Sequence, residues 1–151
     1  MRRTRRLTLS TVAAAVLGLL AATAPSGAAA ADNPYSAEQI CGAGYRVIGG
    51  HQVWSADGTT LGIARLLYSP ATGKNCAVLL KSRQLGTPTY TAVSLKKQGA
   101  KAPWVVDFGD YRYYAGPVYV TAAGTCVRFG ASMSFPNGRK ANYISPFQHC
   151  S

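Results

Sequence analysis

The sequence predicts an all-β fold: a single antiparallel β-sandwich or barrel-like domain of about seven or eight short strands, stapled by two disulfides. β-rich segments alternate with turn signals about every ten residues, as in small sandwiches and barrels. After the first 30 residues, no segment shows a sustained 3.6-residue apolar periodicity. Four cysteines follow an N-terminal export segment, and an even number of cysteines in a short exported chain indicates disulfides.

Residues 1–30 predict a signal peptide that is removed from the mature protein. Four arginines precede an apolar stretch at 7–23, and small residues follow, so cleavage is expected after Ala30 or Ala31. A retained anchor is the alternative, but the apolar run is shorter than the ~20 residues that span a bilayer. Thr8 stands where a twin-arginine signal usually has a bulky apolar residue, which favours Sec export. Residues 31–151 are then expected to form a single secreted domain.

The first half of this domain predicts one helical turn and four strands. The turn covers residues 36–40, with Ser36 as its cap. Gly49-Gly50 indicates a turn between the first two strands, and Asp57-Gly58 a hairpin, since both of these hairpin positions tolerate a positive φ. The expected strands are residues 45–48, 52–55, 59–69 and 76–81, the last nearly all apolar and therefore buried on both faces.

The second half predicts four more strands and a loop. Within one of them Pro117 cannot donate a ladder hydrogen bond, so a bulge, a bend or a sheet edge is expected there. Gly109-Asp110 is predicted to be a turn, and residues 130–149 a loop that Cys150 ties down. The expected strands are residues 89–95, 104–108, 111–121 and 125–129.

The four cysteines allow three disulfide connectivities, between which the sequence does not decide. We prefer Cys41 with Cys76 and Cys126 with Cys150, because this pairing ties each terminal segment to a nearby strand. In the chain-entropy model each bridge contributes about 3.5 to 4 kcal/mol. Zinc binding is disfavoured because no gap resembles a CxxC knuckle, so no metal and no cofactor are expected.

Five short motifs follow one another around these cysteines, at residues 41–48, 72–78, 113–118, 124–127 and 145–150. Together they resemble the spore-associated protein A group of small secreted actinobacterial proteins. The resemblance covers essentially the whole mature chain. It implies secretion and recovery with spores, but no reaction, because the group is not defined by one.

The supply of catalytic groups is small, and we expect no enzyme and no catalytic residues. The two histidines, His51 and His149, lie in no HExxH arrangement, and no GxSxG elbow or phosphate-binding loop occurs. His149 adjoins Cys150, but neighbouring strand residues point to opposite faces. Asp107 and Asp110 are the only close pair of acids, and the predicted turn explains Asp110 without a function.

Aromatic side chains provide the candidate binding surface. Tyrosine can stack on sugar rings or bases while its hydroxyl group bonds to a ligand. The alternative interpretation is that these tyrosines pack on a half-buried sheet and pair across strands. The surface proposed from the sequence comprises Arg112, Tyr113, Tyr114, Tyr119 and Arg128.

The mature chain is basic, since the signal peptide takes four of the 16 lysines and arginines and leaves 12 against five acids, a net charge of +7. This charge favours association with anionic polymers, although scattered positive residues also describe an ordinary solvated surface. We therefore expect a monomeric, extracellular, non-enzymatic protein of the spore or cell surface. Its partners would be wall material, anionic polymers or glycans, with no specific nucleic acid and no membrane span after cleavage. A lectin-like module for polysaccharide and a small protease inhibitor are the alternatives.

Overall fold

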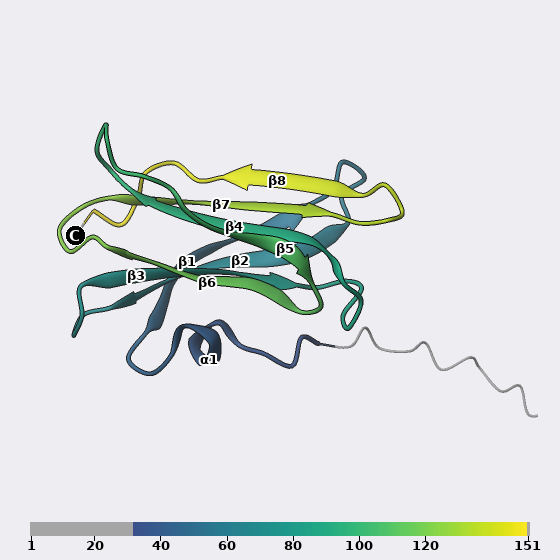
Figure 1. The fold of residues 1–151 in the computed structure, drawn as a ribbon, viewed down its shortest axis with the longest axis horizontal. Coiled ribbons are helices and arrows are strands. Elements are labelled where there is room, and N and C mark those ends of the chain that lie inside the picture. The colour runs from purple at the N-terminus through teal and green to yellow at the C-terminus, as the bar shows by residue number, and fades with distance from the viewer. Residues whose placement is uncertain (1–31, 151) are drawn as a thin grey trace, which may run out of the picture.

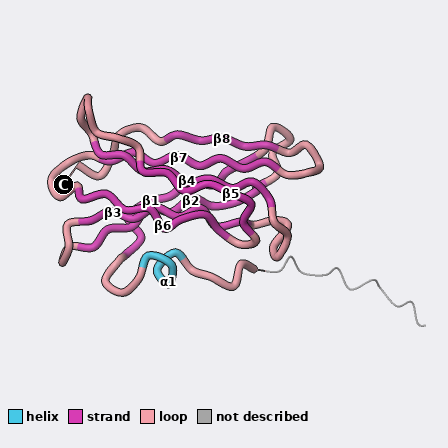
Figure 2. The backbone as a smooth tube through the Cα atoms, in the orientation of Figure 1, coloured by secondary structure: helices cyan, strands magenta, loops and turns pink. Residues whose placement is uncertain are grey.

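Two four-stranded antiparallel sheets face one another as a sandwich in the computed structural model, which describes residues 32–150 (Figures 1 and 2). The predicted signal peptide lies outside these described residues. One sheet has the order β1-β2-β3-β6 and the other β5-β4-β7-β8, so the all-β prediction is confirmed and the architecture is a sandwich. The eight strands of the described residues are β1 (Arg46–Trp54), β2 (Thr60–Ser69), β3 (Lys74–Lys81), β4 (Thr89–Lys97), β5 (Val105–Tyr111), β6 (Tyr114–Thr121), β7 (Val127–Ser134) and β8 (Lys140–Ile144).

The main core fills the space between the two sheets. Side chains of β2 and β3 meet those of β4 and β7 there, and Phe129 is the largest apolar side chain that is fully buried. The alternation of strand side chains leaves every second residue of β2 for the outer face. The core members include Leu61, Leu66, Leu79, Val93, Leu95, Val127, Phe129 and Met133.

A second, smaller core lies on the outer face of the first sheet, under helix α1 (Ala37–Cys41) (Figure 1). The predicted cap at Ser36 is confirmed. Its side chain accepts a hydrogen bond from the Gln39 backbone N–H, and the Gln39 side chain accepts one from the Ser36 backbone N–H. Disulfide Cys41–Cys76 joins α1 to β3. The helix is therefore fixed to the sheet by packing and by a covalent bond.

The second disulfide, Cys126–Cys150, ties the C-terminal segment to the start of β7, beside a backbone pair between Val127 and Gln148. Both bonds follow the sequential pairing that we preferred. The predicted Asp57-Gly58 hairpin joins β1 to β2. Its Asp57 carboxylate accepts hydrogen bonds from Ser55 Oγ and the Thr59 N–H, and these, with Arg139, hold the pKa of Asp57 well below its usual range.

Three local predictions are wrong. Residues 130–149 are not a single loop, because β7 continues to Ser134 and a hairpin leads into β8. The Gly49-Gly50 pair is no turn, because β1 runs through it with an irregular register nearby. A side chain at Gly50 would lie 2.6 Å from the Ala64 carbonyl, so these glycines serve close strand contact. Likewise Asp110 lies within β5, and the turn follows at residues 112–113. The expectation for Pro117 is confirmed: β6 is an edge strand with a register shift there.

Candidate functional site

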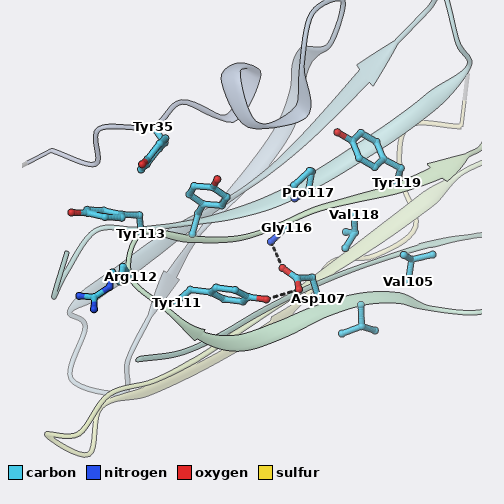
Figure 3. Close-up of a pocket in the computed structure, with 12 residues that line it drawn as sticks. Tyr35, Val105, Asp107, Tyr111, Arg112, Tyr113, Gly116, Pro117, Val118 and Tyr119 are labelled. Atoms are coloured by element: carbon cyan, nitrogen blue, oxygen red, sulfur yellow. Dashed lines mark hydrogen bonds between the residues drawn. The ribbon is translucent and has the colours of Figure 1, made fainter. Parts of the chain in front are cut away.

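The candidate site is a cleft between two edge strands that belong to opposite sheets. β5 and β6 follow one another through a short turn at residues 112–113, so the chain crosses here from one sheet to the other along an open side of the sandwich. We name this feature the tyrosine cleft (Figure 3). It has a volume of about 810 Å³ and is lined by Tyr35, Val105, Val106, Asp107, Tyr111, Arg112, Tyr113, Tyr114, Gly116, Pro117, Val118 and Tyr119.

Tyr35 covers one end of the cleft from the N-terminal lead-in. Its ring meets those of Tyr113 and Tyr114 edge to face, at centroid distances of 5.5 and 5.1 Å. The lead-in is held by Asn33, whose side-chain amide donates to the carbonyls of Lys81 and Tyr113 at 3.0 and 2.8 Å. A segment far from the turn in sequence therefore completes the aromatic cluster, and 42% of the Tyr35 surface remains exposed for a ligand.

Asp107 fastens β5 to β6 at the base of the cleft. One carboxylate oxygen accepts a hydrogen bond from the Tyr111 hydroxyl and the other from the Gly116 backbone N–H, both at 2.6 Å (Figure 3). The hydrogen bond to Asp107, with burial and the negative charge, raises the pKa of Tyr111 above its ordinary value. Because both oxygens already accept a hydrogen bond, the arrangement assigns Asp107 a positioning role.

Tyr119 closes the opposite end of the cleft. Its hydroxyl donates to the Cys41 carbonyl at 2.9 Å, and its ring lies 5.6 Å from that of Tyr45. Burial raises the pKa of Tyr119, with a smaller contribution from Tyr45. The hydroxyl is thus already engaged, so Tyr119 offers a ligand its ring face.

A buried lysine supports the turn between β5 and β6 from inside the sandwich. Lys81 is only 1% exposed, and its Nζ donates to the carbonyls of Thr87 and Tyr111 at 2.7 and 3.0 Å. Its backbone N–H also donates to the Tyr113 carbonyl at 2.9 Å. Burial lowers the pKa of Lys81 to about 8. This residue holds the turn in place but does not line the cleft.

Four of the five predicted surface residues meet in this cleft: Arg112, Tyr113, Tyr114 and Tyr119. The structure does not bring Arg128 to them, which corrects the predicted surface. Arg128 lies on β7 of the second sheet, where its guanidinium donates to the Ser145 carbonyl and lies 4.8 Å from the centre of the Phe147 ring.

Sequence reasoning missed Tyr35 and Asp107 as members of the site. Tyr35 stands in the lead-in, where no periodicity links it to β6. Asp107 had a usable signal: strand alternation puts it on the face opposite Asp110, and an acid on the half-buried face of a strand needs hydrogen-bond partners.

The histidines lie away from the tyrosine cleft. His51 stacks on Tyr143 with ring centroids 3.6 Å apart, and His149 lies against Gly49. Over residues 32–150, no group of three or more His, Cys, Asp or Glu side chains could hold a metal ion. Within the same span, no helix has both the length and the apolar character needed to cross a membrane.

Comparison with known proteins gives one informative relative. No family model matches the chain, and no solved structure matches it. The chain is 42% identical over 123 residues to "Spore-associated protein A" of Streptomyces coelicolor, and the match covers 82% of this chain and 75% of the relative. The aligned length includes more than the cysteine motifs, so the similarity extends through most of the β-domain.

Proposed function

Because the chain belongs to the spore-associated protein A family, as its motifs predicted, we propose that the mature protein is a secreted, non-enzymatic protein that associates with the spore or cell surface. The observation that carries this proposal is the 42% identity to a relative whose name ties it to spores. The predicted signal peptide and the net charge of +7 on the mature chain support it, since wall polymers are rich in anionic groups.

Retention on isolated spores tests this function. Purified mature protein with intact disulfides is mixed with washed spores and cell-wall material, and the bound fraction is measured over a series of salt concentrations. We expect retention that salt weakens, because screening reduces attraction between exposed charges. An unrelated secreted protein of similar size and net charge is the control. Equal retention of the two proteins contradicts the proposal.

Glycan binding by the tyrosine cleft is the second candidate function. The specific observation that favours it is the group of aromatic rings along one open cleft, where Tyr113 and Tyr114 lie under Tyr35. Tyrosine rings present flat apolar faces to sugar rings, and their hydroxyls can bond to sugar hydroxyls. Such a cleft would give a surface protein its attachment to wall or extracellular polysaccharide.

A glycan array followed by titration with the best oligosaccharide tests this second function. We expect Tyr113→Ala to weaken binding, because it removes a ring from the cleft. Tyr90→Ala is the matched control, since Tyr90 is an exposed tyrosine on β4 that does not line the cleft. Equal affinities of the two variants and the unchanged protein rule out this site.

A further inference from the structure

We propose that the ligand of the tyrosine cleft is an acidic glycan, whose sugar rings contact Tyr113 and Tyr114 while its carboxylate or phosphate group pairs with Arg112. This inference rests on the glycan-binding function proposed above and specifies the chemical class of the ligand. It follows from the way in which charge is distributed along the cleft.

Arg112 is exposed but anchored at the aromatic end of the cleft. Its Nη1 donates to the Gly86 carbonyl at 2.5 Å, which fixes the side chain beside Tyr113 (Figure 3). This is the one side-chain hydrogen bond that the guanidinium makes within the described residues, and a guanidinium has five N–H donors. The remaining donors form a planar fork, a geometry that matches a carboxylate or a phosphate.

The acidic side chain that lines the cleft lies away from Arg112 and already accepts two hydrogen bonds. Asp107 is the acid among the lining residues, and the Tyr111 side chain reaches between it and the Arg112 end of the cleft (Figure 3). Its two oxygens already accept hydrogen bonds from the Tyr111 hydroxyl and the Gly116 N–H. A bound acidic sugar would therefore place its anionic group at Arg112, away from the Asp107 carboxylate.

Two matched pairs of ligands test this inference by titration calorimetry at low salt. The first pair is hexagalacturonate and its carboxyl-reduced, neutral form. The second is a phosphomannan oligosaccharide with and without its phosphate, which separates the two sources of negative charge. The variant is Arg112→Gln. Its control is Arg83→Gln, which removes the same charge from an exposed arginine that does not line the tyrosine cleft.

We expect the anionic member of at least one pair to bind about tenfold more tightly than its neutral form, since a hydrogen bond to a charged group contributes this much. Arg112→Gln should abolish the preference, and Arg83→Gln should keep it. Equal binding of charged and neutral forms in both pairs overturns the inference but leaves glycan binding intact. Absence of binding to all four overturns the inference, and a glycan array that also shows no binding overturns the glycan-binding function. Inorganic polyphosphate is a further probe: if it binds as tightly as hexagalacturonate and Tyr113→Ala changes neither affinity, charge alone explains binding and the inference is wrong.

Discussion

Replacing Asp107 by asparagine should destabilise the fold and loosen the tyrosine cleft. The carboxylate accepts two short hydrogen bonds, from the Tyr111 hydroxyl and the Gly116 N–H. A hydrogen bond to a charged acceptor contributes about 1.5 to 3 kcal/mol, whereas asparagine makes two neutral bonds of about 1 kcal/mol each, accepting from the Gly116 N–H and donating to the Tyr111 hydroxyl. The net loss is about 2 kcal/mol, which corresponds to a fall of about 1 M in the urea midpoint for a typical small domain.

Urea unfolding with intact disulfides measures this effect, and Asp110→Asn provides the control. Asp110 lies on the same strand and loses the same charge, but it is exposed and accepts no side-chain hydrogen bond from the described part of the chain. Its variant should unfold within about 0.5 kcal/mol of the unchanged protein. If Asp107→Asn and Asp110→Asn have the same midpoint, the two hydrogen bonds do not fasten β5 to β6 as we argue.

An alkaline titration of tyrosine absorbance gives a second measurement of the Asp107 variant. The hydrogen bond to Asp107 raises the pKa of Tyr111. A raised native pKa contributes stability that is fully present below the unfolded value of about 10 and is lost as the pH rises through the native value. In Asp107→Asn, Tyr111 should ionise at lower pH. An unchanged titration curve would contradict the assignment of Asp107 as the hydrogen-bond partner of the Tyr111 hydroxyl.

Two further predictions concern the staples and the buried lysine. Removing Cys41–Cys76 by paired alanine substitution should cost about 4 kcal/mol, and removing Cys126–Cys150 about 3.5 kcal/mol, from separations of 35 and 24 residues. Removal of Cys41–Cys76 should cost about 1 kcal/mol more than the chain-entropy model gives, because both cysteines are buried and their loss leaves a cavity. Equal urea midpoints for the two variants would contradict this. Because burial lowers the pKa of Lys81 to about 8, the unfolded chain binds more protons between pH 8 and pH 10, and stability should rise with pH by up to about 2 kcal/mol. Lys81→Met should lack this rise, and a rise of the same size in the variant would assign it to another group.

The sequence predicts the sandwich because its strands carry their own signals: β-branched and apolar runs, and turn residues between them. The hairpin before β8 was missed although the sequence carries a signal for it. Asn137-Gly138 is a typical hairpin turn, and it lies between β7 and the alternating segment that forms β8. The second half of β7 is rich in small residues with low strand propensity, so its sequence does not predict a strand. A side chain at Gly130 would lie 2.6 Å from Ser94 Oγ, so β7 uses glycine for close strand contact where propensity suggests a loop.

The site is only partly encoded in local sequence. Arg112, Tyr113 and Tyr114 are neighbours in the chain, so their grouping needs no tertiary information. The side of the sandwich on which Arg128 lies depends on strand order, which periodicity does not specify. The same reason explains why Tyr35 was missed: its partners lie about 80 residues further along the chain and meet it through tertiary packing.

The first disulfide links the stability of this domain to the shape of its cleft. Cys41 ends helix α1 and is bonded to Cys76 on β3, and its carbonyl accepts the hydrogen bond of Tyr119. The same helix follows directly on the lead-in that carries Tyr35. Both ends of the tyrosine cleft therefore depend on a segment that a covalent bond holds to the sheet. Both cysteines are in the disulfide and neither has a free thiol. Their loss would displace the proposed binding surface as well as lower the free energy of unfolding.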